Sequence, residues 1–129
     1  MDVLHLIGRI ILGGYFLYNA LNHLVMGAGA LAGYAQMKGV PAPKAAVYGS
    51  GILLLLGGLS ILLGFQPRWG VLLLILFLVP VSIMIHNFWS EEGEARMGDM
   101  INFTKNMALV GALLALLAIP EPWPYSVGR

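Results

Sequence analysis

The sequence contains no cysteine and few charged residues. The absence of cysteine excludes disulfides, thiol redox chemistry and thiolate metal sites. Charged residues make up 10% of the chain and hydrophobic residues 59%, whereas soluble domains are roughly 25% charged. The net charge is only +1, without a cluster of basic residues, which argues against a nucleic-acid partner. The composition therefore predicts a protein whose apolar surface lies in a lipid bilayer.

Four long apolar stretches account for most of the chain. A transmembrane helix needs about 20 largely apolar residues, and residues 3–26, 45–64, 69–88 and 100–119 meet that requirement. Polar and apolar residues do not alternate with a period of two, so helices are favoured over a β-barrel. We predict an all-α membrane protein, an antiparallel bundle of four transmembrane helices over residues 1–119 with an interfacial tail over 120–129.

The connections between these helices differ in length. Residues 65–68 are few and force a hairpin between the second and third helices. Residues 27–44 and 88–99 form longer loops on the opposite membrane side, here called the loop side, and the side with both termini is called the terminal side. The piece ALAGYAQMKG predicts a short surface helix that stops at Gly39. The second long loop holds four of the six acidic residues, as a solvated loop would: Glu91, Glu92, Glu94 and Asp99.

Membrane orientation depends on the distribution of lysine and arginine. The terminal side has Arg9, Arg68 and Arg129, and the loop side has Lys38, Lys44, Arg96 and Lys105. Three against four gives no preference. We expect a bacterial inner membrane with both termini in the cytoplasm, by analogy with other small helical bundles.

Polar side chains within the apolar stretches are the candidate functional residues, since each is costly in hydrocarbon unless it is paired or hydrated. At about 100° per residue, the first helix brings Arg9, Asn19 and His23 to one narrow face, and Asn22 points away from it. Because the first and third helices run toward the loop side and the fourth returns from it, His23, His86 and Lys105 should meet there. The candidate ligand-binding residues are Arg9, Asn19, His23, His86, Asn87, Asn102, Lys105 and Asn106.

This polar layer is cationic, because no carboxylate lies within a predicted span. Either acidic residues outside the spans fold back onto it, or it accepts an electron-rich ligand such as a lipid phosphate, a carboxylate or a quinone carbonyl. Structural roles are the alternative: Arg9 and Lys105 can extend to the membrane surface. Asparagines and glycines can hold helices together, the glycines being those at 8, 13, 14, 49, 51, 57 and 58. We expect no metal site, because no third ligand converges with the histidines.

Four segments, in their order and spacing, resemble the DoxX family over nearly the whole chain: GRIILGGYFLYNALNHL, YAQMKGVPAPK, HNFW and NFTKNMALVGALL. Arg9, the turn Gly39-Val40-Pro41 and the pair Lys105-Asn106 match the family pattern. The resemblance implies a four-helix membrane protein. Some members are associated with thiosulfate:quinone oxidoreduction or oxidative-stress complexes, and many have no known activity. Members that depend on cysteine give no guidance for this chain.

We therefore expect a pocket formed by His23, His86, Lys105 and Asn106 that binds a quinone or another lipophilic, electron-rich molecule. No cofactor is required by the sequence, and a redox partner subunit or a homodimer is compatible with it. Lys105 and Asn106 would donate hydrogen bonds to a carbonyl, and a histidine would transfer a proton. The alternatives are a non-enzymatic membrane scaffold or assembly factor, and a carrier of lipids or small solutes. Whether the protein is an enzyme stays open.

Overall fold

The computed structural model describes residues 1–127 and is built of helices joined by short links. In chain order these are α1 (Asp2–Leu21), a π-helical turn η1 (Asn22–Met26), α2 (Ala28–Met37), α3 (Pro43–Leu63), α4 (Pro67–Met84), a 3-10 turn η2 (Phe88–Ser90) and α5 (Gly93–Leu116). The prediction of an all-α protein is confirmed, with five α-helices in this part of the chain. Among the described residues, three stretches are long and apolar enough to cross a membrane: Asp2–Met26, Pro43–Leu63 and Pro67–Ser90.

Helix bounds differ from the predicted ones mainly on the loop side. The expected short helix is present as α2, and Gly39 follows it with a φ of 77°. The third predicted helix ends at Met84 instead of residue 88, and Pro80, which lacks a backbone donor, lies inside it four residues before its end. The fourth begins at Gly93 instead of residue 100. Residues 93–99 are therefore the first turns of a helix and not the end of a loop, since charged turns outside the hydrocarbon are compatible with a helix.

Glycines bring α1, α3 and α4 into close contact. A Cβ on Gly13 of α1 would lie 3.1 Å from the carbonyl oxygen of Gly58 in α3. A Cβ on Gly57 would lie 2.5 Å from a side-chain carbon of Leu74 in α4. The missing side chains let the backbones approach. The prediction of close packing was wrong for three other glycines, which have open space at the Cβ position: Gly8, Gly14 and Gly49.

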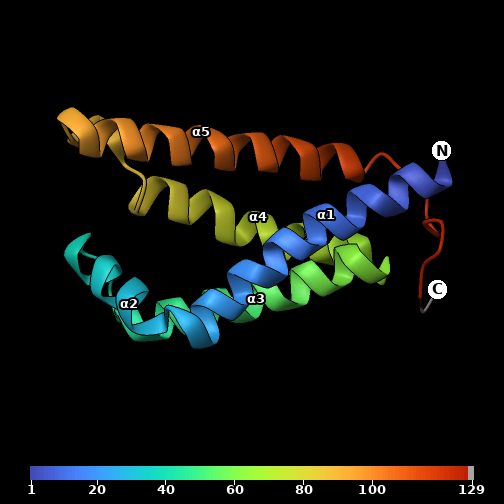
Figure 1. The fold of residues 1–129 in the computed structure, drawn as a ribbon, viewed down its shortest axis with the longest axis horizontal. Helices are drawn as coiled ribbons and strands as arrows, with labels where there is room; N and C mark the ends of the chain where they lie inside the picture. The colour runs from blue at the N-terminus through green and yellow to red at the C-terminus, as the bar shows by residue number, and fades with distance from the viewer. Residues whose placement is uncertain (128–129) are drawn as a thin grey trace.

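The helices form an open row. α1 packs on α3, α3 on α4 and α4 on α5, and within residues 1–127 no close backbone contact joins α1 to α5. In Figure 1, α3 and α4 meet near the end that holds both termini and separate toward the end that holds α2. Buried apolar side chains fill the narrow part of this wedge, among them Phe16, Leu54, Ile61, Leu74 and Leu113. The wide part of the wedge, on the loop side, contains a cavity.

Candidate functional site

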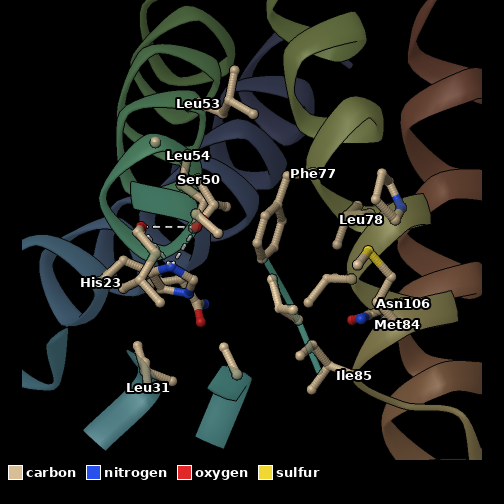
Figure 2. A pocket seen from close by; sticks show the side chains of 18 of the residues that line it. His23, Leu31, Ser50, Leu53, Leu54, Phe77, Leu78, Met84, Ile85 and Asn106 are labelled. Atoms are coloured by element: carbon tan, nitrogen blue, oxygen red, sulfur yellow. Dashed lines mark hydrogen bonds between the residues drawn. The ribbon is translucent and has the colours of Figure 1, made fainter. Parts of the chain in front are cut away.

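A cavity of about 570 Å³ lies between the α1–α3 pair and the α4–α5 pair. Most of its walls are apolar, and α2 and the link from α2 to α3 contribute to its loop-side end through Leu31 and Val40. Figure 2 shows His23 and Ser50 on one wall and Met84 and Asn106 on the opposite wall. Five of the eight candidate residues line it: Asn19, His23, His86, Lys105 and Asn106. The other three, Arg9, Asn87 and Asn102, lie outside the lining.

His23 projects from the π-helical turn at the end of α1. In this turn the amide of Gly27 donates to the carbonyl of Asn22 at 2.8 Å, five residues back. Asn22, the first residue of this turn, also lines the cavity, contrary to the expectation that it points away. The Nδ1 atom of His23 lies 2.9 Å from Ser50 Oγ and 3.4 Å from Val47 O. The ring is therefore fixed at the cavity wall by α3.

Asn106 is buried on the α5 side of the cavity. Its Nδ2 donates to Ser82 Oγ at 3.1 Å, and Ser82 Oγ donates to Leu78 O at 2.6 Å. This chain of hydrogen bonds joins α5 to α4. One amide N–H of Asn106 is therefore already used inside the protein, while its carbonyl oxygen remains an acceptor.

His86 belongs to a charged cluster at the loop-side end that the sequence did not predict. Its Nδ1 lies 2.9 Å from Asp99 Oδ1. Lys38, at the end of α2, donates to Asp99 at 3.1 Å, to Glu91 at 2.9 Å and to the side-chain oxygen of Asn87 at 2.8 Å. Of the two alternatives, the acidic residues fold back, but onto Lys38 instead of Lys105. The only sequence signal was that these opposite charges lie in two loops on one membrane side.

The cluster shifts the protonation of its members. Burial by itself raises the pKa of Asp99, but contacts with Glu91, His86 and Lys38 outweigh burial and lower it to about 2. Burial lowers the pKa of Lys38, and the carboxylates of Glu91 and Asp99 outweigh that effect and raise it. Lys38 and Asp99 are thus held as an ion pair that ties α2 to the start of α5.

Lys105 lies at an exposed edge of the cavity where α1 and α5 face each other without backbone contact. Its Nζ is 3.5 Å from Asn102 Oδ1 and 5.8 Å from the centre of the Tyr15 ring. Asn19, on the same edge, donates to the carbonyl of Tyr15 at 2.9 Å. This edge is polar and open, so Lys105 can reach the cavity or the surface.

Arg9 serves the terminal side instead of the cavity. It is only 1% exposed, and it donates to Ile61 O at 3.1 Å and Leu62 O at 2.9 Å in the last turn of α3. It also donates to the carbonyls of Pro124 and Tyr125 in the tail. The guanidinium thus joins a helix end to a tail packed against the bundle; the last two tail residues, 128 and 129, lie outside the described part.

Comparisons with known proteins agree with this architecture. The model of the DoxX family matches residues 4–87, which run from the first turn of α1 to just beyond α4 and include both cavity histidines. The chain is 32% identical to the inner membrane protein YphA of Escherichia coli (strain K12) over 127 residues, covering 98% of this chain and 89% of that protein. No solved structure matches the chain. The chain belongs to the DoxX family of integral membrane proteins.

Proposed function

We propose that this protein binds a quinone or another lipophilic, electron-rich molecule in the cavity, as part of a bacterial inner-membrane redox system. The observation that carries the proposal is the cavity itself. Its volume of about 570 Å³ lies within the roughly 300–1,000 Å³ of small-molecule sites. Apolar walls with a few polar groups are also the usual composition of such sites.

The residues at the walls fit a ring that carries oxygen substituents. Phe77 and Leu78 offer apolar surface to the ring, and His23, Asn106 and Lys105 offer polar atoms around it. His23, Phe77 and Leu78 belong to stretches apolar enough to span the membrane, so a lipophilic ligand can arrive from the bilayer. We also propose that α5 is the fourth crossing of an antiparallel four-helix bundle, with both termini in the cytoplasm.

A photoreactive azido-benzoquinone with a decyl chain tests the proposal on the purified protein in detergent. We expect labelled peptides from residues 15–23 and 76–86, and protection by excess decyl-benzoquinone. Decyl-benzoquinone should also raise the melting temperature, because a ligand that binds only the folded state stabilises it. Label confined to the outer surface around Trp69, without protection and without a rise in melting temperature, would contradict quinone binding.

A non-enzymatic scaffold is the second candidate, and one observation favours it. Many polar groups near the cavity already have protein partners, such as Asn106 with Ser82 and Lys38 with Asp99. Such pairs fix helix packing without any ligand. A scaffold predicts a melting temperature that no lipophilic ligand changes. A carrier is less well supported, because the buried cluster around Leu54, Ile61 and Leu113 fills the terminal side of the described chain.

A further inference from the structure

We infer that the cavity selects a hydroxylated amphiphile, a quinol or an alkylphenol, over the oxidised quinone or an ether. Its O–H would donate to Nε2 of His23, and its chain would leave between α3 and α4 beside Gly49. The inference rests on the proposed function, and it names the chemical form of the ligand and the way it sits in the site.

The hydrogen bonds around Ser50 decide which nitrogen of His23 carries the proton. Ser50 Oγ lies 2.8 Å from Val47 O, which can only accept, so we assign the serine hydrogen to that bond. With this assignment Ser50 Oγ accepts from His23 Nδ1 at 2.9 Å. The carbonyl of Val47, 3.4 Å from the same nitrogen, can also only accept. Nδ1 is therefore the protonated nitrogen, and Nε2 of the neutral ring is an acceptor. No residue in the described range hydrogen-bonds Nε2 (Figure 2).

The opposite wall has the same polarity. Because Ser82 gives its hydrogen to Leu78 O, it can only accept from Asn106 Nδ2. The amide orientation of Asn106 is thereby fixed, and its Oδ1 is left as an acceptor. The cationic donor of the lining, Lys105, lies at the exposed α1–α5 edge. Two interior acceptors thus have a fixed orientation, Nε2 of His23 and Oδ1 of Asn106, and both can accept a hydrogen bond from a ligand O–H.

The shape of the wedge indicates where an alkyl chain leaves. Near the terminal side α3 and α4 are in tight contact, since a Cβ on Gly57 or Gly70 would lie under 3 Å from a side chain. Further toward the loop side, a Cβ on Gly49 has no atom within 4 Å. Gly49 and the exposed Leu76 and Pro80 line the cavity there. A cavity of about 570 Å³ holds one drug-sized molecule, so a long chain must extend through this apolar edge into lipid.

Two matched ligands test the inference on the full chain in detergent. 4-Decylphenol and 4-decylanisole differ only in the O–H donor, and dissociation constants follow from titrated shifts in melting temperature. We expect the phenol to bind roughly tenfold more tightly, because the ether leaves a buried acceptor unpaired. His23→Phe should bring the two affinities together. Decyl-benzoquinol should likewise bind more tightly than decyl-benzoquinone.

The chain exit has its own pair of variants. Gly49→Leu should lower the affinity for 4-decylphenol roughly tenfold, because the leucine side chain would block the apolar edge and expose part of the alkyl chain to water. The affinity for 4-methylphenol, which has no long chain, should stay the same. Gly14→Leu is the matched control, since Gly14 also faces open space but does not line the cavity. If His23→Phe does not fold, the inference is still tested by two measurements. These are the ratio of the phenol and ether affinities of the unaltered protein and the comparison of Gly49→Leu with Gly14→Leu.

The two levels of proposal fail differently. Equal binding of phenol and ether, or of quinol and quinone, overturns the selection of a hydroxyl while cavity binding stands. Equal effects of Gly49→Leu and Gly14→Leu overturn the chain exit. If neither the phenol, the ether, the quinol nor the quinone shifts the melting temperature, the proposed function itself fails.

Discussion

Arg9 shows how the structure changes the meaning of one residue. A buried arginine in an apolar helix suggests a ligand site, but its donors all reach backbone carbonyls, at the end of α3 and in the tail. We predict that Arg9→Met lowers the free energy of unfolding by about 2–4 kcal/mol, because several buried carbonyls lose their charged donor. Thermal or denaturant unfolding in detergent measures this loss.

Arg68 is the control for that experiment. Its side chain is 75% exposed and lies 4.0 Å from Glu121, and such surface pairs contribute little. Arg68→Gln should change stability by less than about 0.5 kcal/mol. Equal effects of the two substitutions would show that Arg9 does not clamp the helix end. A loss of ligand binding in Arg9→Met without a loss of stability would show that Arg9 is a ligand-binding residue after all.

At the scale of elements, the Lys38 cluster fastens α2 and the start of α5 together. Because folding lowers the pKa of Asp99 from its ordinary value of 3.8 to about 2, this group stabilises the fold fully above pH 3.8. Its contribution is lost as the pH falls through about 2. The shift corresponds to about 2 kcal/mol. We predict that Asp99→Asn is less stable than the unaltered protein at pH 7, and that the difference shrinks steadily between pH 4 and pH 2.

The measurement is the free energy of unfolding of both proteins across that pH range. Glu94→Gln is the control, because Glu94 lies in the exposed first turn of the same helix, and this substitution should change the free energy of unfolding by less than about 0.5 kcal/mol. A difference between Asp99→Asn and the unaltered protein that does not change with pH would mean that the Asp99 charge does not fasten the two elements.

The positions of the apolar helices could be predicted from the hydrophobic pattern of the sequence. Length and apolarity located α1, α3 and α4 to within a few residues, and Gly39 marked the end of α2. The start of α5 at Gly93 could not be predicted from apolarity, because its first turns are charged. A run of charged residues fits a helix equally well when that helix extends beyond the hydrocarbon.

The convergence of three candidate residues on one cavity could be predicted from the direction in which each helix runs. Helices running toward and away from one membrane side bring His23, His86 and Lys105 to the same cavity. The partner of Lys38 was not predictable, because it depends on how two loops fold over the end of the wedge. The orientation of His23 also depends on its contact with Ser50 in another helix. A contact between distant parts of the sequence cannot be predicted from the residues around His23.

At the scale of the whole molecule, both ends of the described chain lie together. The amide of Val127 donates to Leu63 O at 2.9 Å, and Arg9 of α1 contacts the same tail. Figure 1 shows the N-terminus and the tail at the same end of the bundle. Within residues 1–127, three stretches qualify as spans by length and composition, and three crossings would put the ends on opposite membrane sides. The packing of α5 along α4 resolves this conflict if α5 is a fourth crossing despite its polar first turns.

We therefore predict an even number of crossings. In Escherichia coli, fusions of green fluorescent protein and alkaline phosphatase to each end should report the same compartment, and alkaline phosphatase inserted at Gly93, before α5, should report the opposite one. Ends in opposite compartments would mean that α5 does not cross and that the α1–α5 edge of the cavity is not within the membrane. Because lysines and arginines divide almost evenly between the two sides, the same fusions also decide whether the shared compartment is the cytoplasm, which the positive-inside rule cannot do here.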